Sequence, residues 1–165
     1  YGETFVIPEP YIPKVGARNM SLQEPEKKMS KSDPNPNAYI RILDEPDAIL
    51  RKFKRAVTDS EGEITENPER AGVYNLLSIY GACTNKTIDE AVASFAGKGY
   101  GDLKGAVAEA VIETLNPIRT EYNRLLAEKT YLTETMKRGA ERAQLTARKT
   151  TQKVYHKMGF DSYQA

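Results

Sequence analysis

Hydrophobic residues from about position 46 onward recur with the period of an α-helix. The clearest stripe stands at positions i, i+3, i+4 and i+7 and consists of Val73, Leu76, Leu77 and Tyr80. This spacing places the residues on one helix face, which can then be buried. The same pattern predicts helices over residues 46–57, 71–84, 88–95, 103–125 and 132–158. In the first of them the apolar stripe extends as far as Val57.

Two helix ends carry recognisable signals. Residues 87–90, Thr-Ile-Asp-Glu, have the form of a capping box, which predicts a helix start. Gly159 followed by Phe160 is typical of a helix that ends at a left-handed glycine with an apolar residue behind it. On the last helix, the small side chains of Ala140, Ala143 and Ala147 indicate close contacts with another helix.

The first 37 residues follow a different pattern. Residues 4–7 are β-branched or aromatic, which predicts a buried strand, and the prolines at positions 8, 10 and 13 prevent regular pairing after it. We therefore expect a mainly α fold with a boundary near Asn37. Before this boundary lies the end of an α/β unit, and after it a helical bundle.

Composition excludes several classes of protein. Among 165 residues, 24 Lys and Arg stand against 23 Asp and Glu, a formal net charge of +1, so any surface for nucleic acid must be local. Cys83 is the only cysteine, which excludes a disulfide framework and a cysteine-based zinc site, and we expect it to be a small core residue. No apolar run approaches the ~18 residues of a membrane span.

One short basic segment, residues 27–34, stands out from its surroundings. It combines Lys28 and Lys31 with the hydroxyl groups of Ser30 and Ser32. Preorganised cations and hydrogen-bond donors are what a leaving phosphate group requires. A solvated Lys/Ser linker has the same composition, so composition alone leaves both interpretations open.

The order of these residues decides between the two interpretations. Lys28-Met29-Ser30-Lys31-Ser32 is identical to the KMSKS signature of class I aminoacyl-tRNA synthetases, and a chance match is on the order of 10⁻⁴. Further stretches resemble the tryptophanyl-tRNA synthetase family; they are residues 8–13, 16–18, 20–22, 32–35, 55–60, 72–77 and 100–104. The resemblance extends from about Tyr11 to Phe160.

This resemblance implies both a fold and an activity. Residues 1–37 would be the end of a Rossmann-like nucleotide-binding catalytic domain with its KMSKS loop, and residues 38–165 an α-helical tRNA anticodon-binding domain. The family joins tryptophan to ATP, releases pyrophosphate and transfers tryptophan to tRNA(Trp). It also implies a cytoplasmic homodimer, with Mg²⁺ accompanying ATP, although no protein ligand for this ion can be identified.

The resemblance also implies roles for individual residues. Lys28 and Lys31 would be the catalytic residues, which bind the ATP phosphates and stabilise the leaving pyrophosphate. The ATP-binding set is Asn19, Lys28, Met29, Ser30, Lys31 and Ser32, in which Asn19 contributes its backbone near the adenine. For tRNA contact we choose the basic residues of the last helices, Arg138, Arg142, Arg148, Lys149 and Lys153. Another cationic cluster, Arg51, Lys52, Lys54 and Arg55, fits either tRNA phosphate contact or a solvated helix face.

Two features of the family are absent from these residues. The sequence has no His-x-Gly-His-like motif, and the tryptophan pocket belongs to the family's N-terminal part; His156, the only histidine, is expected at the surface. Because the chain also begins at Tyr1 without methionine, we expect the C-terminal half of a longer enzyme, inactive alone and dependent on the missing half for tryptophan. Three alternatives stay open: a non-catalytic helical RNA-binding module, a tyrosyl-type synthetase fragment and a helical bundle used for oligomer contacts.

Overall fold

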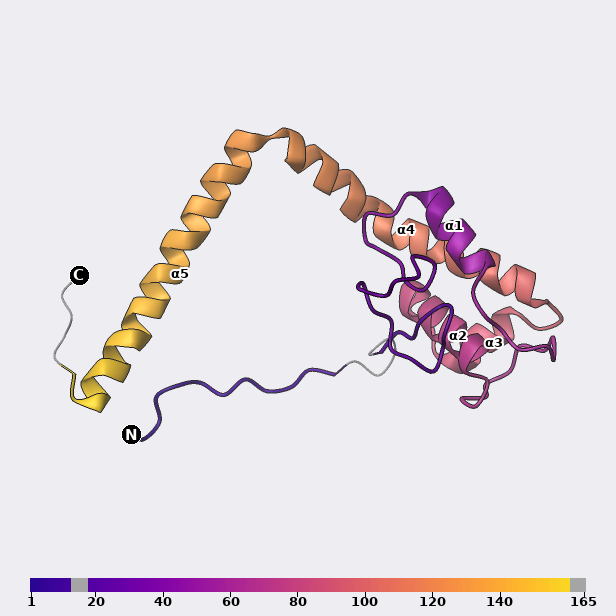
Figure 1. Ribbon diagram of the computed structural model, residues 1–165, viewed down its shortest axis with the longest axis horizontal. Helices are drawn as coiled ribbons and strands as arrows, with labels where there is room; N and C mark the ends of the chain where they lie inside the picture. Colours follow the sequence, from indigo (N-terminus) through magenta and orange to yellow (C-terminus); the bar gives the residue numbers. More distant parts are fainter. Residues whose placement is uncertain (13–17, 161–165) are drawn as a thin grey trace. The chain divides into compact units, whose positions relative to one another are not determined.

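The computed structural model describes residues 1–12 and 18–160, and helices dominate this part of the chain. The described helices are α1 (Pro46–Lys54), α2 (Ala71–Thr84), α3 (Ile88–Ser94), α4 (Tyr100–Ala127) and α5 (Lys129–Met158) (Figure 1). The mainly α fold and the five predicted helices are therefore confirmed. Judged by length and hydropathy, none of these described helices could span a bilayer. Residues 13, 16 and 17 of the stretches that carry the family resemblance lie outside the described part.

The chain packs as two units. One extends from Ile12 to Glu121 and contains α1, α2, α3 and most of α4, and the other combines Tyr1–Tyr11 with the residues after Glu121. This division follows packing alone, so the functional boundary near Asn37 stays a prediction.

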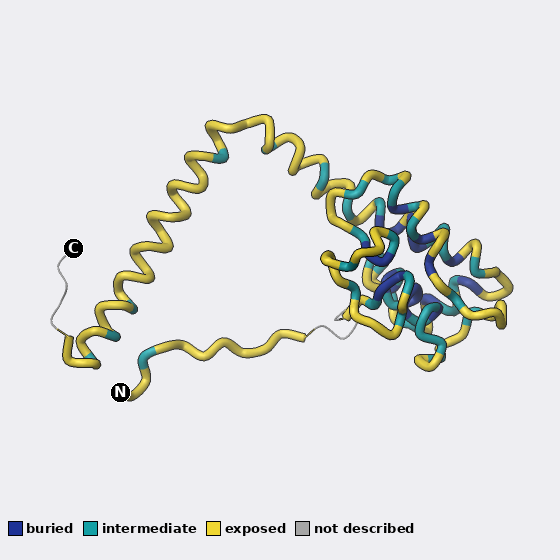
Figure 2. Tube along the Cα trace, in the orientation of Figure 1, coloured by how far each residue is buried: buried dark blue, intermediate teal, exposed yellow. Residues whose placement is uncertain are grey.

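The hydrophobic core belongs to the unit that begins at Ile12. The buried stretches of the chain lie in this unit (Figure 2). Its largest fully buried apolar side chains come from three helices and one loop, and they are Ile49, Phe53, Val73, Leu76, Leu77, Leu103, Val107 and Leu22. Each such side chain contributes roughly 1.5–3 kcal/mol through burial. Cys83 packs against this core as a partly buried residue, in line with its expected role.

The first helix is shorter than its apolar stripe predicts. Helix α1 ends at Lys54, and Val57 lies beyond it with 44% of its surface exposed, so the placement of Val57 on the buried face was wrong. The physical reason is a competing backbone contact: the Val57 N–H donates to the Leu22 carbonyl at 2.7 Å. This bond draws the chain away from helical geometry after α1.

Both predicted helix ends are confirmed. Thr87 accepts a hydrogen bond from the Glu90 N–H while the Glu90 carboxylate accepts one from the Thr87 N–H, which completes the capping box of α3. Gly159 caps α5 with φ 76°, and the Phe160 N–H reaches the Tyr155 carbonyl at 3.0 Å. The rings of Tyr155 and Phe160 meet edge to face, 6.1 Å apart.

Helix α5 is largely exposed. It has no buried residue (Figure 2), and Ala140, Ala143 and Ala147 are exposed. The prediction of close helix contacts at these alanines was therefore wrong for the described residues. Alanine has the highest helix propensity of all residues, and here it supports a long helix instead of close packing. His156 is exposed in the last turn, as expected.

The N-terminal segment also differs from its prediction. Phe5, Val6 and Ile7 are 69%, 95% and 88% exposed and form no strand, so the buried strand over residues 4–7 was wrong. A strand needs a neighbour that takes its N–H and C=O groups, and no described residue provides one here. The segment instead meets α5 through Lys157, whose ammonium donates to the Thr4 hydroxyl at 3.1 Å.

Candidate functional site

The KMSKS segment begins in a short antiparallel hairpin. The Ser21 N–H donates to the Lys27 carbonyl at 2.8 Å, and the Met29 N–H donates to the Asn19 carbonyl at 3.0 Å. Between these two bonds Met20 and Lys28 lie opposite each other as an antiparallel bridge. The hairpin therefore brings Asn19 next to Met29, two residues that the family resemblance assigned separately to ATP.

Beyond the hairpin the chain turns tightly around Lys31. The Asp33 N–H donates to the Ser30 carbonyl at 3.2 Å, which closes a four-residue turn with Lys31 inside it. The hydroxyl oxygens of Ser30 and Ser32 lie 3.0 Å apart, and the Ser30 oxygen also accepts the Ser32 N–H at 3.3 Å. In this arrangement the two hydroxyl groups hydrogen-bond to each other and hold the turn.

The three lysines of this segment differ in their partners. Lys27 forms an ion pair with Glu24, and this hydrogen-bonded carboxylate raises the pKa of the Lys27 ammonium. Lys28 and Lys31 are exposed, and no residue in the described part of the chain forms an ion pair with either. Exposed pairs such as Lys27–Glu24 contribute little energy, but they occupy the cation. The two lysines available to an anion are thus the two that the resemblance selects.

Leu22 closes the base of the loop. Its side chain is 2% exposed, its N–H donates to the Ala38 carbonyl at 2.9 Å, and its own carbonyl accepts the Val57 N–H. One buried residue thereby joins the start of the loop, its end and the segment after α1. Sequence reasoning assigned no role to Leu22, because a lone leucine in a polar stretch carries no periodic signal.

Asn75 of α2 holds the first strand of the hairpin. It is 3% exposed, its carboxamide donates to the Met20 carbonyl at 2.9 Å, and its oxygen accepts the Met20 N–H at 2.9 Å. A buried amide without such partners would be costly, and here Met20 provides one donor and one acceptor to the Asn75 carboxamide. Sequence reasoning missed Asn75, although a polar residue directly before the core pair Leu76 and Leu77 was a usable signal.

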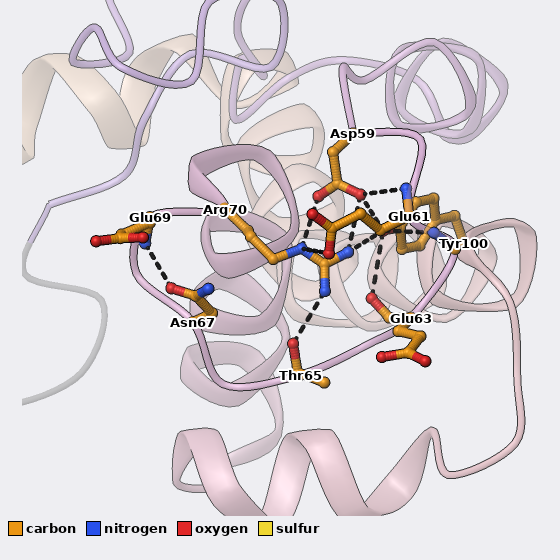
Figure 3. Close-up of polar contacts among 9 residues, drawn as sticks. Asp59, Glu61, Glu63, Thr65, Asn67, Glu69, Arg70 and Tyr100 are labelled. Carbon is orange, nitrogen blue, oxygen red and sulfur yellow. Dashed lines mark hydrogen bonds and ion pairs between the residues drawn. The ribbon is translucent and has the colours of Figure 1, made fainter.

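A polar cluster fixes the segment that follows Val57 (Figure 3). The Arg70 guanidinium donates to both Asp59 oxygens, at 2.9 and 2.8 Å, and to the Thr65 hydroxyl at 3.0 Å. The Tyr100 hydroxyl hydrogen-bonds to both Asp59 and Arg70, accepts the Gly62 N–H at 3.2 Å and lies 3.2 Å from the Glu63 carbonyl.

This cluster unites stretches that are far apart in the sequence. Asp59 and Tyr100 belong to two of the stretches that resemble the tryptophanyl family, and Arg70 stands just before a third. The paired guanidinium holds the pKa of Asp59 well below its usual value, whereas burial and the Asp59 carboxylate raise the pKa of the Tyr100 phenol. Within the cluster, Arg70 and Asp59 form a bidentate ion pair, and their side chains are 9% and 29% exposed. Such charge-assisted pairs are stronger than hydrogen bonds between neutral groups.

The cationic cluster on α1 divides in two. Lys52 forms an ion pair with Asp44 at 2.5 Å and donates to the Tyr39 carbonyl at 3.0 Å, with only 12% of its side chain exposed. Lys52 therefore holds the chain before α1 and presents little charge to a partner. The neighbouring cations Arg51, Lys54 and Arg55 are exposed.

The basic residues proposed for tRNA all lie exposed on α5. At 3.6 residues per turn, Arg138, Arg142, Lys149 and Lys153 fall within about 60° of one another around the helix axis. Arg148 lies about 80° to the other side of Arg138. Four of the five selected residues thus form one stripe, which we call the α5 stripe.

A helical unit with its own hydrophobic core carries the KMSKS signature on an exposed hairpin. These features are typical of the class I tRNA synthetases. A family model described as "tRNA synthetases class I (W and Y)" matches residues 1–116, and the chain belongs to this family.

Curated relatives narrow the type of enzyme within that class. The tryptophan–tRNA ligase of Wolinella succinogenes is 52% identical over 159 residues, which are 96% of this chain and 48% of that protein. The Bacillus subtilis tryptophan–tRNA ligase is 51% identical over 160 residues, again 96% of this chain and 48% of that protein. The chain thus spans about half the length of the curated relatives it matches, and it corresponds to their C-terminal half.

Solved structures agree with this assignment. A tryptophanyl-tRNA synthetase from Mycoplasma pneumoniae has a TM-score of 0.78 at 31% identity, covering 91% of this chain and 46% of the other. The enzyme from Campylobacter jejuni complexed with ADP and tryptophan has a TM-score of 0.66 at 27% identity, covering 96% and 49%. These matches do not favour the tyrosyl-type alternative.

We expect Asp59→Asn to change how stability depends on pH. Because the folded pKa is depressed, the stabilisation by Asp59 is fully present above its unfolded pKa of about 3.9 and is lost as pH falls through the lower folded value. The parent's urea midpoint should therefore drop between about pH 5 and pH 2. The variant should be less stable than the parent at pH 7, with a shallower loss in acid.

The matched control is Asp47→Asn, which removes the same charge from an exposed position in the first turn of α1. This control should follow the acid slope of the parent, as measured by circular dichroism in urea. Equal slopes for Asp59→Asn and the parent would refute the role assigned to this pair.

Proposed function

We propose that this chain supplies the ATP-phosphate loop and the tRNA-binding helices of a tryptophan–tRNA ligase. The observation that carries the proposal is the pair Lys28 and Lys31, exposed on the loop without an ion-pair partner among the described residues, beside Lys27, which has one. The family membership and the tryptophan-enzyme relatives support it.

The chemistry follows from where charge develops. In the first step the tryptophan carboxylate attacks the α-phosphorus of ATP, a new P–O bond forms, and the bond to the β-phosphate oxygen breaks. Pyrophosphate leaves with the electron pair of that bond. Lys28 and Lys31 would meet this charge as ammonium groups, and cations aimed at developing charge lower the barrier. Ser30, Ser32 and Met29 would shape the loop, and the Asn19 backbone would lie near the adenine.

Mg²⁺ would arrive with ATP on its phosphates. The described residues contain no group of three or more His, Cys, Asp and Glu side chains suited to hold a metal ion. The oxygens of the phosphates are the ligands that Mg²⁺ prefers, and this ion usually keeps several waters. The ATP phosphates would therefore be the main ligands that this half of the protein sees.

The second step is transfer of tryptophan to tRNA(Trp). We assign residues 1–37 to the catalytic domain and residues 38–165 to tRNA binding, with the α5 stripe and Arg148 on the anticodon side. Tryptophan itself would be bound by the other half of a longer, cytoplasmic, homodimeric enzyme. The exposed side chains of Phe5, Val6 and Ile7 fit a segment that such a half would cover.

Replacing Lys28 or Lys31 by Ala should reduce adenylate formation. The experiment uses a chimera in which this chain replaces the matching half of the Bacillus subtilis tryptophan–tRNA ligase. Loss of one group that stabilises developing charge costs roughly 10²–10³ in kcat, so tryptophan-dependent pyrophosphate exchange should fall by that factor. Lys27→Ala, one position earlier, is the matched control and should exchange like the parent chimera.

The parent chimera and the isolated chain complete this test. The chimera should catalyse pyrophosphate exchange, whereas the isolated 165 residues should not, because the proposal places the tryptophan site in the other half of the enzyme. An inactive chimera that is correctly folded would contradict the proposed function. Lysine variants that exchange as fast as Lys27→Ala would contradict the roles of Lys28 and Lys31.

Charge reversal on the α5 stripe should weaken tRNA binding without affecting the adenylate step. In the same chimera, Arg142→Glu with Lys149→Glu should raise the Kd for tRNA(Trp). The slope of log Kd against log salt concentration should become smaller by about 0.7–0.9 for each phosphate contact that is lost. Pyrophosphate exchange should stay unchanged. Lys129→Glu, also exposed on α5 but about 180° from Arg138 and about 100° from Arg148 around the helix axis, is the control. A similar loss in the control would remove the α5 stripe from the proposal.

A further inference from the structure

Met20 has an unusual position in the KMSKS hairpin. The two hairpin hydrogen bonds are made by its neighbours, Asn19 and Ser21, so Met20 and Lys28 form a non-hydrogen-bonded pair. In such a pair the N–H and C=O groups of each residue point outward, to where the next strand would lie. The outward side of Met20 therefore needs a partner with one donor and one acceptor.

Asn75 takes the place of that missing strand. Its carboxamide donates to the Met20 carbonyl and accepts the Met20 N–H, both at 2.9 Å. A carboxamide is the side-chain group that offers a donor and an acceptor side by side, as a backbone peptide does. A carboxylate has no donor, and a single hydroxyl cannot span both backbone groups. The Asn75 side chain thus makes the two hydrogen bonds that a third strand would make at Met20.

The element that carries Asn75 is firmly held in the core. Leu76 and Leu77 follow it directly and are 1% and 0% exposed. One turn earlier, a Cβ on Gly72 would lie 2.3 Å from the Val57 carbonyl oxygen, so only glycine permits this approach. Val57 in turn bonds to Leu22 at the base of the loop. Two neighbouring turns of α2 therefore hold the hairpin from the Met20 side and from the Leu22 side.

The contact between Asn75 and Met20 lies in the hairpin, just before the chain turns around Lys31. Met20 lies opposite Lys28, and Asn19 and Met29 are bonded to each other beside it. Lys31 lies three residues after Lys28, in a turn that is closed by hydrogen bonds among residues 30–33. Lys28 is thus attached to the helical core through the hairpin, whereas Lys31 is held only by the turn around it. The two lysines therefore differ in their freedom to move toward a nucleotide.

We propose that Asn75 is a positioning residue for the ATP-phosphate loop. It fixes Met20, and through the hairpin it fixes Lys28 and the Asn19 backbone relative to the helical core. Asn75 touches no reacting atom in this role. The inference rests on the proposed function for its catalytic consequence, whereas its structural part, the anchoring of the hairpin, stands without it.

The test uses Asn75→Asp, which has the same shape but has lost the donor to the Met20 carbonyl. In the chimera, misplacing a catalytic group by about 1 Å costs on the order of 10²-fold, so kcat/KM for ATP should fall by roughly 10-fold to 100-fold. The KM for tryptophan should stay at the parent value. The control Ile79→Ala shortens a buried apolar side chain that lies on the same helix and cannot hydrogen-bond to the hairpin.

Hydrogen exchange provides a readout that does not depend on activity. Peptides covering residues 19–29 of the folded chimera should exchange faster in Asn75→Asp, whereas peptides covering residues 103–111 of α4 should match the parent. Ile79→Ala should not show this local effect. Should Asn75→Asp fail to fold, Asn75→Ser replaces it, since its shorter hydroxyl cannot reach both Met20 groups.

The outcomes separate the two proposals. Faster exchange at residues 19–29 together with a loss confined to ATP supports Asn75 as a positioning residue. Unchanged exchange at residues 19–29 overturns the anchoring, whether or not the chimera is active. Equal losses for ATP and tryptophan, or the same pattern in Ile79→Ala, overturn the positioning role. An inactive parent chimera contradicts only the proposed function, because hydrogen exchange at residues 19–29 still decides whether Asn75 anchors the hairpin.

Discussion

The structure depends on two turns of α2 that perform two tasks at once. Leu76 and Leu77 bury their side chains in the core, while Asn75 and Gly72 hold the chain that leads into the KMSKS loop. Because both tasks share one stretch of helix, the position of the loop is set by the same packing that stabilises the unit. Protein interiors are close-packed and transmit strain, so such a helix is a rigid support for the loop.

The polar cluster of Asp59, Arg70 and Tyr100 extends this support to the segment between α1 and α2. Without it, residues 58–69 would be a long polar connection with little apolar surface to bury. The bidentate pair orders the connection and so keeps Val57 against Leu22. It also brings together stretches that resemble the family and lie far apart in the sequence, since Asp59 and Tyr100 meet in this cluster.

The sequence allowed the periodic parts of the fold to be predicted. The stripe from Val73 to Tyr80, the capping box at Thr87 and the glycine cap at Gly159 all depend on local geometry, and all were confirmed. Errors arose where the partner lies far away in the chain. Val57 left its helix for Leu22, and residues 4–7 formed no strand, because a strand is defined by a neighbour and not by its own side chains.

The candidate site followed the same division. The lysines were found from a contiguous signature, whereas Leu22 and Asn75 act through backbone bonds that join residues 16 to 55 positions apart. No periodicity encodes such pairs. A buried polar residue beside core leucines was the one local hint, because burial of an amide requires a hydrogen-bond partner somewhere. The unit formed by residues from 12 to 121 thus contains both the loop and its support.

The most direct test of this account is the ATP-dependent protection of single lysines from an amine-modifying reagent. It would be measured by peptide mass spectrometry in the chimera with the Bacillus subtilis enzyme. Saturating ATP should slow the modification of Lys28 and Lys31 and leave Lys27, paired with Glu24, and the remote Lys137 unchanged. Equal rates at Lys28 and Lys31 with and without ATP would contradict the claim that this loop binds the nucleotide phosphates.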